Sequence, residues 1–494
     1  MSDRSVLVEE IKQHSSSNDC WIVVDNVVWD ITEFAPTHPG GVEIIHRHAG
    51  LDASTAYNTV HSPALIRKTL GPGKRIGQLD TSTPREQSDL LKPPPNEVAQ
   101  PQLEIGAKPP LETLINSYDF EKVAEKTLTK KAWAFYSSAA TDLITKEGNK
   151  KLFDRIWLRP RLLRNVRDIN TRTSILGQNV QLPFFVSPAA MAKLAHPDGE
   201  LAIARGCEKF GIGQCISTNA SFSMAEITSS APSVPFFFQL YVNKDRAASE
   251  ALLKDAESNG MKGIFVTIDG PVQGKREADE RVKVESASVA TAAISGVAAS
   301  NDSKGGGLGR TMGGYIDATF SWDDIAWLRR STKLPIVVKG VQTAEDANLA
   351  CRYGVDGIMI SNHGGRNLDT SPPSLLTLLE IRRHYPEVFQ KIEVFVDCGI
   401  RRGTDIVKAL CLGVKAVGMG RSFLYSLVYG QEGVEHFIDI MKDELETSMR
   451  LLGMTDLSQA HPRYLNTCDI DHLIPKTLDE PLEGSSRPLI LSKL

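Results

Sequence analysis

The sequence predicts two folding units, a small α+β module at the N-terminus and a large parallel (β/α)8 barrel, or TIM barrel, behind it. Three observations predict this division: a length of 494 residues, a proline-rich stretch near residue 100, and eight short apolar segments beyond it. A chain of this length exceeds what one hydrophobic core usually supports. We therefore expect a module over residues 1–78, a linker over 79–110, a barrel over 111–480 and a tail over 481–494.

Composition argues against several classes of protein. With 41% hydrophobic residues, 23% charged residues and a net charge of -4, the chain has no electrostatic signature of nucleic-acid binding. No apolar run reaches the length of a membrane span, and the N-terminus resembles neither a signal peptide nor a transit peptide. Seven cysteines, odd in number and without a CxxC pair, indicate reduced thiols in an intracellular compartment.

The N-terminal module begins with two predicted strands, residues 20–24 and 26–30, around an Asp-Asn turn. Helical patterns follow the sequence HPGG at His38, and a second histidine, His61, comes later in AYNTVHS. This order of strands and histidines resembles cytochrome b5. The resemblance implies that His38 and His61 are the axial ligands of a haem b iron. Filling both axial positions suits electron transfer rather than oxygen binding.

Apolar side chains that can contact the porphyrin follow the HPGG turn: Ile44, Ile45, Ala56, Tyr57, Val60, Leu65 and Leu70. His46 and His48 are close in sequence and are expected to be solvated. Two alternatives stay open, namely a zinc site, which requires tetrahedral clustering of the four histidines, and surface histidines without any ligand role. The HPGG motif with correctly placed strands favours haem.

The predicted linker, residues 79–110, changes in composition to Pro, Ser, Glu, Asp and Lys and includes KPPP and KPP runs. In polyproline geometry such a segment extends by about 3.1 Å per residue. The module therefore need not be rigidly docked on the barrel.

Eight apolar segments, separated mostly by helical patterns, predict the strands of a parallel barrel. They are residues 182–187, 214–218, 235–241, 263–269, 334–340, 357–363, 394–399 and 416–421. The polar residue that ends each strand is expected at the carboxyl-end mouth, where barrel active sites are built. The connection after the fourth strand is long, and its Ser/Ala/Gly-rich stretch, 286–309, is expected to bury little apolar surface and to act as a mobile lid.

Six motifs at successive strand ends carry a second resemblance. They are FQLYVNKDR from Phe238, FVTIDGP from Phe265, LPIVVKGV from Leu334, SNHGGRNLD from Ser361, VFVDCGIRRGTD from Val394 and VGMGRSFLY from Val417. In this order they resemble the FMN-dependent L-2-hydroxy-acid oxidase and dehydrogenase family. The resemblance implies an FMN cofactor, oxidation of a small 2-hydroxy acid to the 2-oxo acid, and a homotetramer.

Phosphate binding is predicted after the seventh and eighth strands, where Gly399 and Gly420 let backbone amides approach and Arg401 and Arg421 supply charge. The resemblance implies that Lys339 stabilises reduced flavin, although a salt-bridged barrel lysine is the open alternative. It also implies that the remaining flavin-binding residues are Ser187, Pro188, Ala189, Ala190, Ser217, Gln239, Thr267, Asp397, Cys398 and Ile400.

Catalysis requires a base, a group that stabilises the protonated base, and a clamp for the substrate carboxylate. The resemblance assigns these roles to His363, to Asp269, and to Arg366 with Arg276. An imidazole accepts a proton near neutral pH, and a neighbouring carboxylate orients it and favours the imidazolium. Arg366 offers two parallel hydrogen bonds to a carboxylate. Tyr241 is expected to hydrogen-bond the substrate hydroxyl.

Three positions depart from the family's pattern. Phe135 replaces a tyrosine that helps to bind the carboxylate, Asn219 replaces a large apolar residue, and Ala189 replaces a threonine. The sequence therefore leaves the hydroxy acid open. The electron acceptor also stays open between a haem protein, a quinone-like acceptor and O2. Two alternatives to a dehydrogenase remain: an oxidase that forms hydrogen peroxide and a non-catalytic flavin and haem redox sensor.

The chain ends in Ser492-Lys493-Leu494, the tripeptide that the peroxisomal import receptor binds. We therefore expect a peroxisomal protein, or a cytoplasmic one if the signal is not used.

Overall fold

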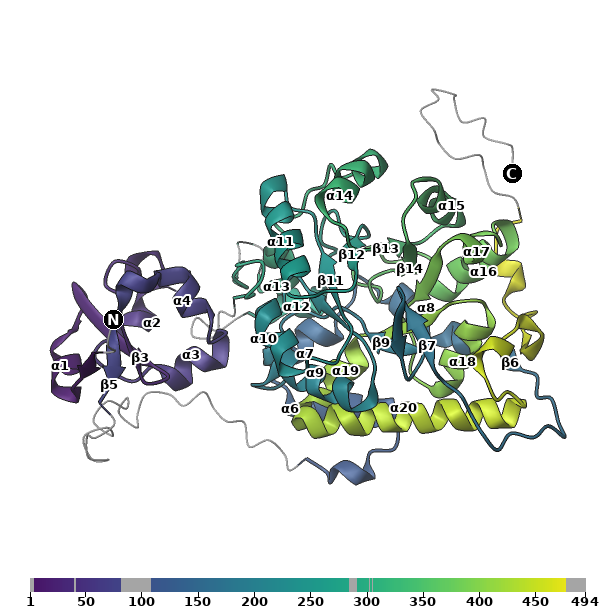
Figure 1. Cartoon of the computed structure of the whole chain (residues 1–494), viewed down its shortest axis with the longest axis horizontal. Coiled ribbons are helices and arrows are strands. Elements are labelled where there is room, and N and C mark those ends of the chain that lie inside the picture. Colours follow the sequence, from purple (N-terminus) through teal and green to yellow (C-terminus); the bar gives the residue numbers. More distant parts are fainter. Residues whose placement is uncertain are drawn as a thin grey trace.

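The computed structural model describes residues 4–39, 41–80, 108–283, 291–301, 303 and 305–476. Figure 1 shows two bodies in these ranges, the N-terminal module and, beside it, the barrel with its helices. Most of the predicted linker and the predicted tail with its SKL end lie outside the described residues. No helix within the described ranges is both long and apolar enough to cross a membrane.

The N-terminal module is built on a five-stranded sheet with the order β1-β5-β4-β3-β2. The two predicted strands are confirmed as β3 (Asp19–Val24) and β4 (Val27–Asp30), which pair antiparallel. Between them Asp25 and Asn26 have φ angles of 51° and 62°, the left-handed pair that a tight hairpin turn requires. The other elements are β1 (Ser5–Val6), α1 (Val8–Gln13), β2 (Ser15–Ser16), α2 (Val42–His46), α3 (Ser54–Val60), α4 (Leu65–Leu70) and β5 (Arg75–Leu79).

All eight predicted barrel strands are present, and they form one closed parallel barrel in chain order. The last strand pairs with the first, with Met419 opposite Val186. The strands are β9 (Phe184–Val186), β10 (Gln214–Ser217), β11 (Phe236–Leu240), β12 (Ile264–Thr267), β13 (Ile336–Val341), β14 (Gly357–Ile360), β15 (Glu393–Val396) and β16 (Ala416–Met419).

Aromatic side chains fill the barrel interior. Phe185, Phe237, Phe265 and Phe395 are fully buried, and their rings pack with centroid separations from 5.7 to 6.5 Å. A hairpin of β7 (Thr173–Ile175) and β8 (Gln178–Val180) packs against the same cluster. Because Leu176 between these strands donates its amide to Glu393 at the start of β15, the hairpin covers the amino ends of the strands. The opposite mouth is left for a site.

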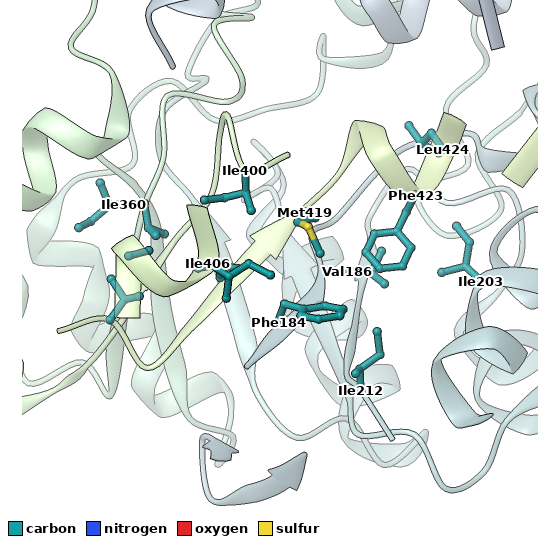
Figure 2. Packing of buried hydrophobic residues seen from close by; sticks show 14 of the residues in the cluster. Phe184, Val186, Ile203, Ile212, Ile360, Ile400, Ile406, Met419, Phe423 and Leu424 are labelled. Carbon is teal, nitrogen blue, oxygen red and sulfur yellow. The ribbon is translucent and has the colours of Figure 1, made fainter. Parts of the chain in front are cut away.

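Alternate strand residues point outward and pack under the surrounding helices. Figure 2 shows Phe184 and Val186 of β9 among Phe423, Leu424 and other side chains of this outer layer. The helices of the barrel are α9 (Gly199–Phe210), α10 (Met224–Ser230), α11 (Arg246–Ser258), α12 (Glu277–Arg281), α13 (Leu308–Met312), α14 (Ile325–Ser331), α15 (Ala344–Arg352), α16 (Ser374–His384), α17 (Val388–Lys391), α18 (Gly403–Cys411), α19 (Arg421–Ser426) and α20 (Gly430–Leu452).

Three helices precede the barrel: α6 (Ser117–Thr127), α7 (Lys130–Ser137) and α8 (Ile144–Asp154). The long helix α20 runs along one side of the barrel, where it packs on α9 and α18 (Figure 1). A short antiparallel pair, β6 (Trp157–Leu158) with β17 (Leu465–Asn466), joins the two ends of this unit.

The long connection after β12 corrects one prediction. Its described part buries apolar side chains, because Ala292 is 0% and Ala299 1% exposed. The segment is also held by backbone hydrogen bonds, from Ala293 N to Ala220 O at 2.9 Å and from Ser295 N to Thr218 O at 3.1 Å. The expectation that this stretch buries little apolar surface is therefore wrong for residues 291–301. Small alanine side chains fit closely under a loop that composition alone marks as polar.

Candidate functional site

A cavity of about 280 Å³ lies at the carboxyl ends of the barrel strands. Its wall includes every residue predicted to bind flavin, from Ser187, directly after β9, to Arg421 on α19. Of the five predicted catalytic residues, Tyr241, Arg276, His363 and Arg366 line it, whereas Asp269 lies behind His363. The motifs that are far apart in sequence thus meet at one mouth of the barrel.

His363 and Asp269 form the predicted pair. Nδ1 of His363 lies 2.8 Å from Oδ1 of Asp269, whose side chain is fully buried. Because an ionised carboxylate only accepts hydrogen bonds, this contact places the proton on Nδ1 and leaves Nε2 as the basic nitrogen. Nε2 lies 3.4 Å from the hydroxyl of Tyr241, which donates to it. The unprotonated nitrogen therefore lies beside the predicted substrate position.

Burial lowers the pKa of His363, and the Asp269 carboxylate offsets part of that decrease. Burial alone would raise the pKa of Asp269, but the neighbouring His363 and Lys339 lower it. At neutral pH the pair is a neutral imidazole beside a carboxylate. That is the state a general base requires before it accepts a proton.

Lys339, on β13, lies between two carboxylates. Its Nζ is 3.9 Å from Oδ2 of Asp269 and 3.8 Å from Oδ2 of Asp397, and it donates to Ser361 Oγ at 3.1 Å. Burial would lower its pKa, but Asp397 and Asp269 raise that pKa above the ordinary value. Lys339 is thus both a salt-bridged lysine and a permanent cation in the cavity wall. A salt-bridged lysine, the alternative that the sequence left open, is therefore compatible with the predicted stabilisation of reduced flavin.

The residues predicted to hydrogen-bond the flavin ring form a connected network. Gln239 Nε2 donates to Thr267 Oγ1 at 3.0 Å, and its Oε1 accepts from Thr218 N at 3.1 Å and from Ser217 Oγ at 3.4 Å. Ser187 directly follows β9, the neighbour of β10 in the barrel, and its Oγ donates to Asp397 Oδ2 at 3.3 Å. These bonds fix the side chains before any ligand binds.

The two arginines expected at the substrate and phosphate ends share backbone partners. Arg366 Nη1 donates to Tyr136 O at 3.1 Å and to Ser138 O at 2.8 Å. Arg421 donates to the same two oxygens, from Nε at 3.1 Å and from Nη2 at 3.0 Å. Both guanidinium groups are anchored by the carboxyl end of α7, so they present fixed charges to the cavity.

Arg276 is 5% exposed and is fixed by Gln273, which the sequence did not single out, and by a backbone oxygen. Its Nη2 donates to Gln273 Oε1 at 2.8 Å, and its Nε donates to Arg366 O at 3.1 Å. Arg276 lies near the start of the long connection after β12. In the structure it is a buried residue of the cavity wall.

The predicted phosphate end fits FMN. Gly399 has a φ of 88°, and a Cβ there would lie 2.1 Å from the carbonyl oxygen of Asn149, so only glycine is accommodated. At Gly420 the nearest heavy atom to an added Cβ is 3.8 Å away, so its backbone borders open space. Arg401 supplies charge, although Glu121 accepts from it at 2.6 Å and offsets part of that charge. Glycine backbone and guanidinium groups are the donors a phosphate monoester requires.

Cys398 occupies a left-handed backbone position, with a φ of 74°. Its thiol donates to Asp397 Oδ1 at 2.8 Å and accepts from the Gly364 amide at 3.1 Å. Burial raises its pKa to about 12. The thiol is therefore a neutral bridge between two predicted site loops.

A second cavity, of about 520 Å³, lies in the N-terminal module. His38 and His61 face each other across it, with ring centroids 6.1 Å apart and ring planes at 87°. Because a metal–imidazole bond is roughly 2 Å long, this separation fits one metal ion held between the rings. All seven apolar residues expected to contact the porphyrin line the cavity. The residues present therefore fit haem.

The imidazoles of both histidines are in the neutral form, which can bind a metal ion. Burial lowers the pKa of His38, and burial together with His38 and Lys193 lowers that of His61 to about 4. His38 Nδ1 donates to Gly41 O at 3.2 Å, which leaves Nε2 for a metal. Metal ligation requires the unprotonated imidazole nitrogen that these contacts provide.

His48 differs from its prediction. It lines the cavity and donates from Nδ1 to Ile44 O at 3.0 Å, so it is not a purely solvated side chain. In the part of the chain that the structure describes, no group of three or more His, Cys, Asp or Glu residues is placed to hold a metal. The four histidines are therefore not arranged as the zinc alternative requires.

The barrel contributes to the second cavity, which the sequence did not predict. Lys193 Nζ donates to His61 O at 2.5 Å, and Ser62 Oγ donates to Glu226 Oε2 at 2.5 Å. Glu226 also caps α10 through Ser223. The connection after β12 closes one side of the cavity with Thr291, Ala293, Ile294, Ser295 and Gly296. These contacts join residues more than 130 positions apart, which local sequence patterns do not reveal.

Two family models match this chain. Residues 124–467 match the FMN-dependent dehydrogenase family, and residues 8–80 match the cytochrome b5-like haem/steroid-binding domain. L-lactate dehydrogenase (cytochrome) of Saccharomyces cerevisiae is 41% identical over 97% of this chain and 82% of its own length. Glycolate oxidase 3 of Arabidopsis thaliana is 40% identical over 72% of this chain and 96% of its own length.

The barrel also resembles a crystal structure of the flavin-binding domain of baker's yeast flavocytochrome b2. The TM-score is 0.66, with 42% identity over 76% of this chain and 91% of that one. Sequence and structure comparisons therefore point to the same relatives.

Proposed function

The chain belongs to the FMN-dependent dehydrogenase family and carries a cytochrome b5-like domain in front of it, and on this basis we propose that it oxidises a short L-2-hydroxy acid, such as L-lactate, to the 2-oxo acid. The residues of the barrel cavity would hold FMN, which would supply two-electron oxidation of the alcohol, and His38 and His61 would hold haem b, which would supply one-electron transfer. The observation that carries the proposal is the His363–Asp269 pair at the mouth of the barrel, inside a cavity lined by the predicted flavin-binding residues.

The residues of this chain account for binding and proton transfer. Arg366 and Arg276 hold the substrate carboxylate, and Tyr241 donates to or accepts from its hydroxyl. Nε2 of His363 takes the proton that leaves the alcohol or the α-carbon, and the Asp269 carboxylate stabilises the imidazolium. Lys339 lies in the wall of the cavity that would hold FMN, and its positive charge would stabilise reduced flavin.

Anaerobic mixing with L-2-hydroxy acids tests the proposal. We expect the flavin absorbance to bleach and the haem to be reduced after it. A protein that carries both cofactors and is bleached by no hydroxy acid would instead be a redox sensor.

The pH dependence should report the environment of His363. Activity requires the neutral imidazole of His363, and burial lowers the pKa of that imidazole. As the pH is lowered, kcat/KM should therefore stay constant past the ordinary imidazole pKa of about 6.5 and fall only at a lower pH. Initial rates measured between pH 5 and 8 give the acid side of this pH profile. An acid limb above the ordinary value would contradict the assignment of His363 as the base.

Phe135→Tyr tests the substrate position. Phe135 is buried in the cavity wall, and the guanidinium of Arg366 lies 5.4 Å from its ring centroid. Restoring a hydroxyl here should tighten binding of L-lactate by about tenfold, as expected for one hydrogen bond to a charged group. Saturation of the flavin-reduction rate gives the dissociation constant. Unchanged or weaker binding would show that the substrate lies differently, with Phe135 packed against it.

We propose that the protein is located in the peroxisome, because the sequence contains the import tripeptide Ser492-Lys493-Leu494. These three residues lie outside the described residues. A fluorescent protein fused to the N-terminus should be punctate with peroxisomal markers. Deleting the three residues should make it diffuse. A mitochondrial pattern, or no change on deletion, would exclude a peroxisomal localisation.

The remaining partners are proposed from the family resemblance. The chain is expected to form a homotetramer, and electrons leave it to a haem protein, a quinone-like acceptor or O2. The similarity to a glycolate oxidase supports direct reaction of reduced flavin with O2 as the second candidate activity.

A further inference from the structure

Asn219 lines the active-site cavity but has no part in the proposed proton transfer. It is 6% exposed and follows the end of β10 by two residues. Its backbone amide donates to Ser217 Oγ at 3.1 Å, and its carbonyl oxygen accepts from Met191 N at 3.1 Å. The position of Asn219 is therefore fixed relative to the flavin-binding residue Ser217.

Two hydroxyl groups fix the orientation of the Asn219 side chain. Ser295 Oγ donates to its Oδ1 at 2.8 Å, and the hydroxyl of Tyr315 donates to the same oxygen at 3.4 Å. Burial raises the pKa of Tyr315, so its hydroxyl stays protonated and able to donate. With Oδ1 occupied by two donors, the amide nitrogen Nδ2 is left as the free end of the side chain.

Nδ2 of Asn219 makes no hydrogen bond to any other residue that the structure describes. Nδ2 is not fully buried, and Asn219 lines the cavity. The nitrogen is therefore accessible from the cavity and carries two N–H donors. A donor held in one orientation at a cavity wall is the kind of group that gives a pocket its specificity.

The charge around Asn219 indicates what it would bind. Its side-chain partners, Ser295 and Tyr315, are neutral, and the cavity's Arg366 and Arg276 are assigned to the carboxylate that every substrate of the class carries. A second carboxylate at Asn219 would lack a cation of its own, and an unpaired buried charge costs far more than a neutral polar group. A neutral oxygen, such as a hydroxyl, fits this donor better.

We propose that Asn219 selects short L-2-hydroxy acids that carry a neutral oxygen on the side chain, such as a 3-hydroxyl group, over acids with an apolar side chain. The inference rests on the proposed function and narrows its substrate class. An apolar side chain would cover Nδ2 without accepting its hydrogen bond, whereas a 3-hydroxyl group would accept it.

L-glycerate and L-2-hydroxybutyrate test the inference, because they have the same shape and differ by a hydroxyl in place of a methyl group. With the purified full-length protein carrying both cofactors, kcat/KM should favour L-glycerate by about tenfold. Asn219→Leu should reverse the preference. Asn219→Asp keeps the shape but cannot donate, so it should abolish the preference.

Ser295→Ala is the control for orientation. It leaves the amide in place but removes one of the two donors to Oδ1, so the preference should weaken without reversing. Equal kcat/KM for the two acids in the wild-type protein, or an unchanged ratio in Asn219→Leu, would overturn the inference. If neither acid nor L-lactate bleaches the flavin, the proposed function itself fails; if L-2-hydroxybutyrate is used as well as L-glycerate, only the role of Asn219 fails.

Discussion

His363→Gln is expected to slow reduction of the flavin by substrate roughly 10³- to 10⁴-fold, the upper part of the range for a general base. The variant loses the nitrogen that accepts the substrate proton. It leaves untouched the glycine and arginine residues of the phosphate end and the two histidines of the haem cavity. FMN and haem should therefore stay bound. Stopped-flow absorbance measures the rate, and the visible spectrum after gel filtration measures cofactor content.

His472→Gln is the matched control, because His472 is exposed on the surface and lines neither cavity. It should keep the wild-type rate. His363→Ala should behave like His363→Gln. Rapid flavin reduction in either His363 variant would remove the histidine from the mechanism.

His61→Ala is expected to have the opposite effect. Loss of an axial ligand should perturb or empty the haem site, because both histidines face one metal position with ring centroids 6.1 Å apart. The barrel cavity is complete without the N-terminal module, so substrate should still reduce FMN at the wild-type rate. Haem absorbance and flavin bleaching, recorded on the same sample, separate the two effects.

The same variant distinguishes the two candidate acceptors. In the wild-type protein His38 and His61 would occupy both ligand positions of a haem iron, so the flavin would be the site that supplies electrons to O2. Any hydrogen peroxide that the wild-type protein forms should therefore persist in His61→Ala. His46→Ala, in a histidine of the same module that does not line the cavity, should keep the haem spectrum. Failure of a folded His61 variant to reduce flavin would show that the two modules do not work separately.

Much of this architecture is predictable because it follows from local patterns. Each barrel strand is a short apolar run, and all eight occur where that pattern places them. The His363–Asp269 contact could be predicted for the same reason, since both residues lie in motifs at strand ends, and parallel strands bring those ends together. Chain order and strand direction are sufficient to predict such a site.

Contacts between distant surfaces were not predictable. The hydrogen bond from Ser62 to Glu226 spans 164 positions, and that from Ser295 to Asn219 spans 76. Composition was misleading for residues 291–301, where small side chains looked suited to solvent but Ala292 and Ala299 are buried. A pattern shows which residues avoid water, but it does not show which surfaces meet.

The loop at Ser295 has a thermodynamic consequence, because the same residue lines one cavity and holds a side chain that lines the other. Ser295 holds the substrate-facing amide of Asn219 and also lines the haem cavity of the N-terminal module. Equilibrium linkage is reciprocal. Any factor by which docking of the haem module changes substrate affinity must therefore equal the factor by which substrate changes docking. Measuring either one, for instance substrate affinity with and without the module, gives the other.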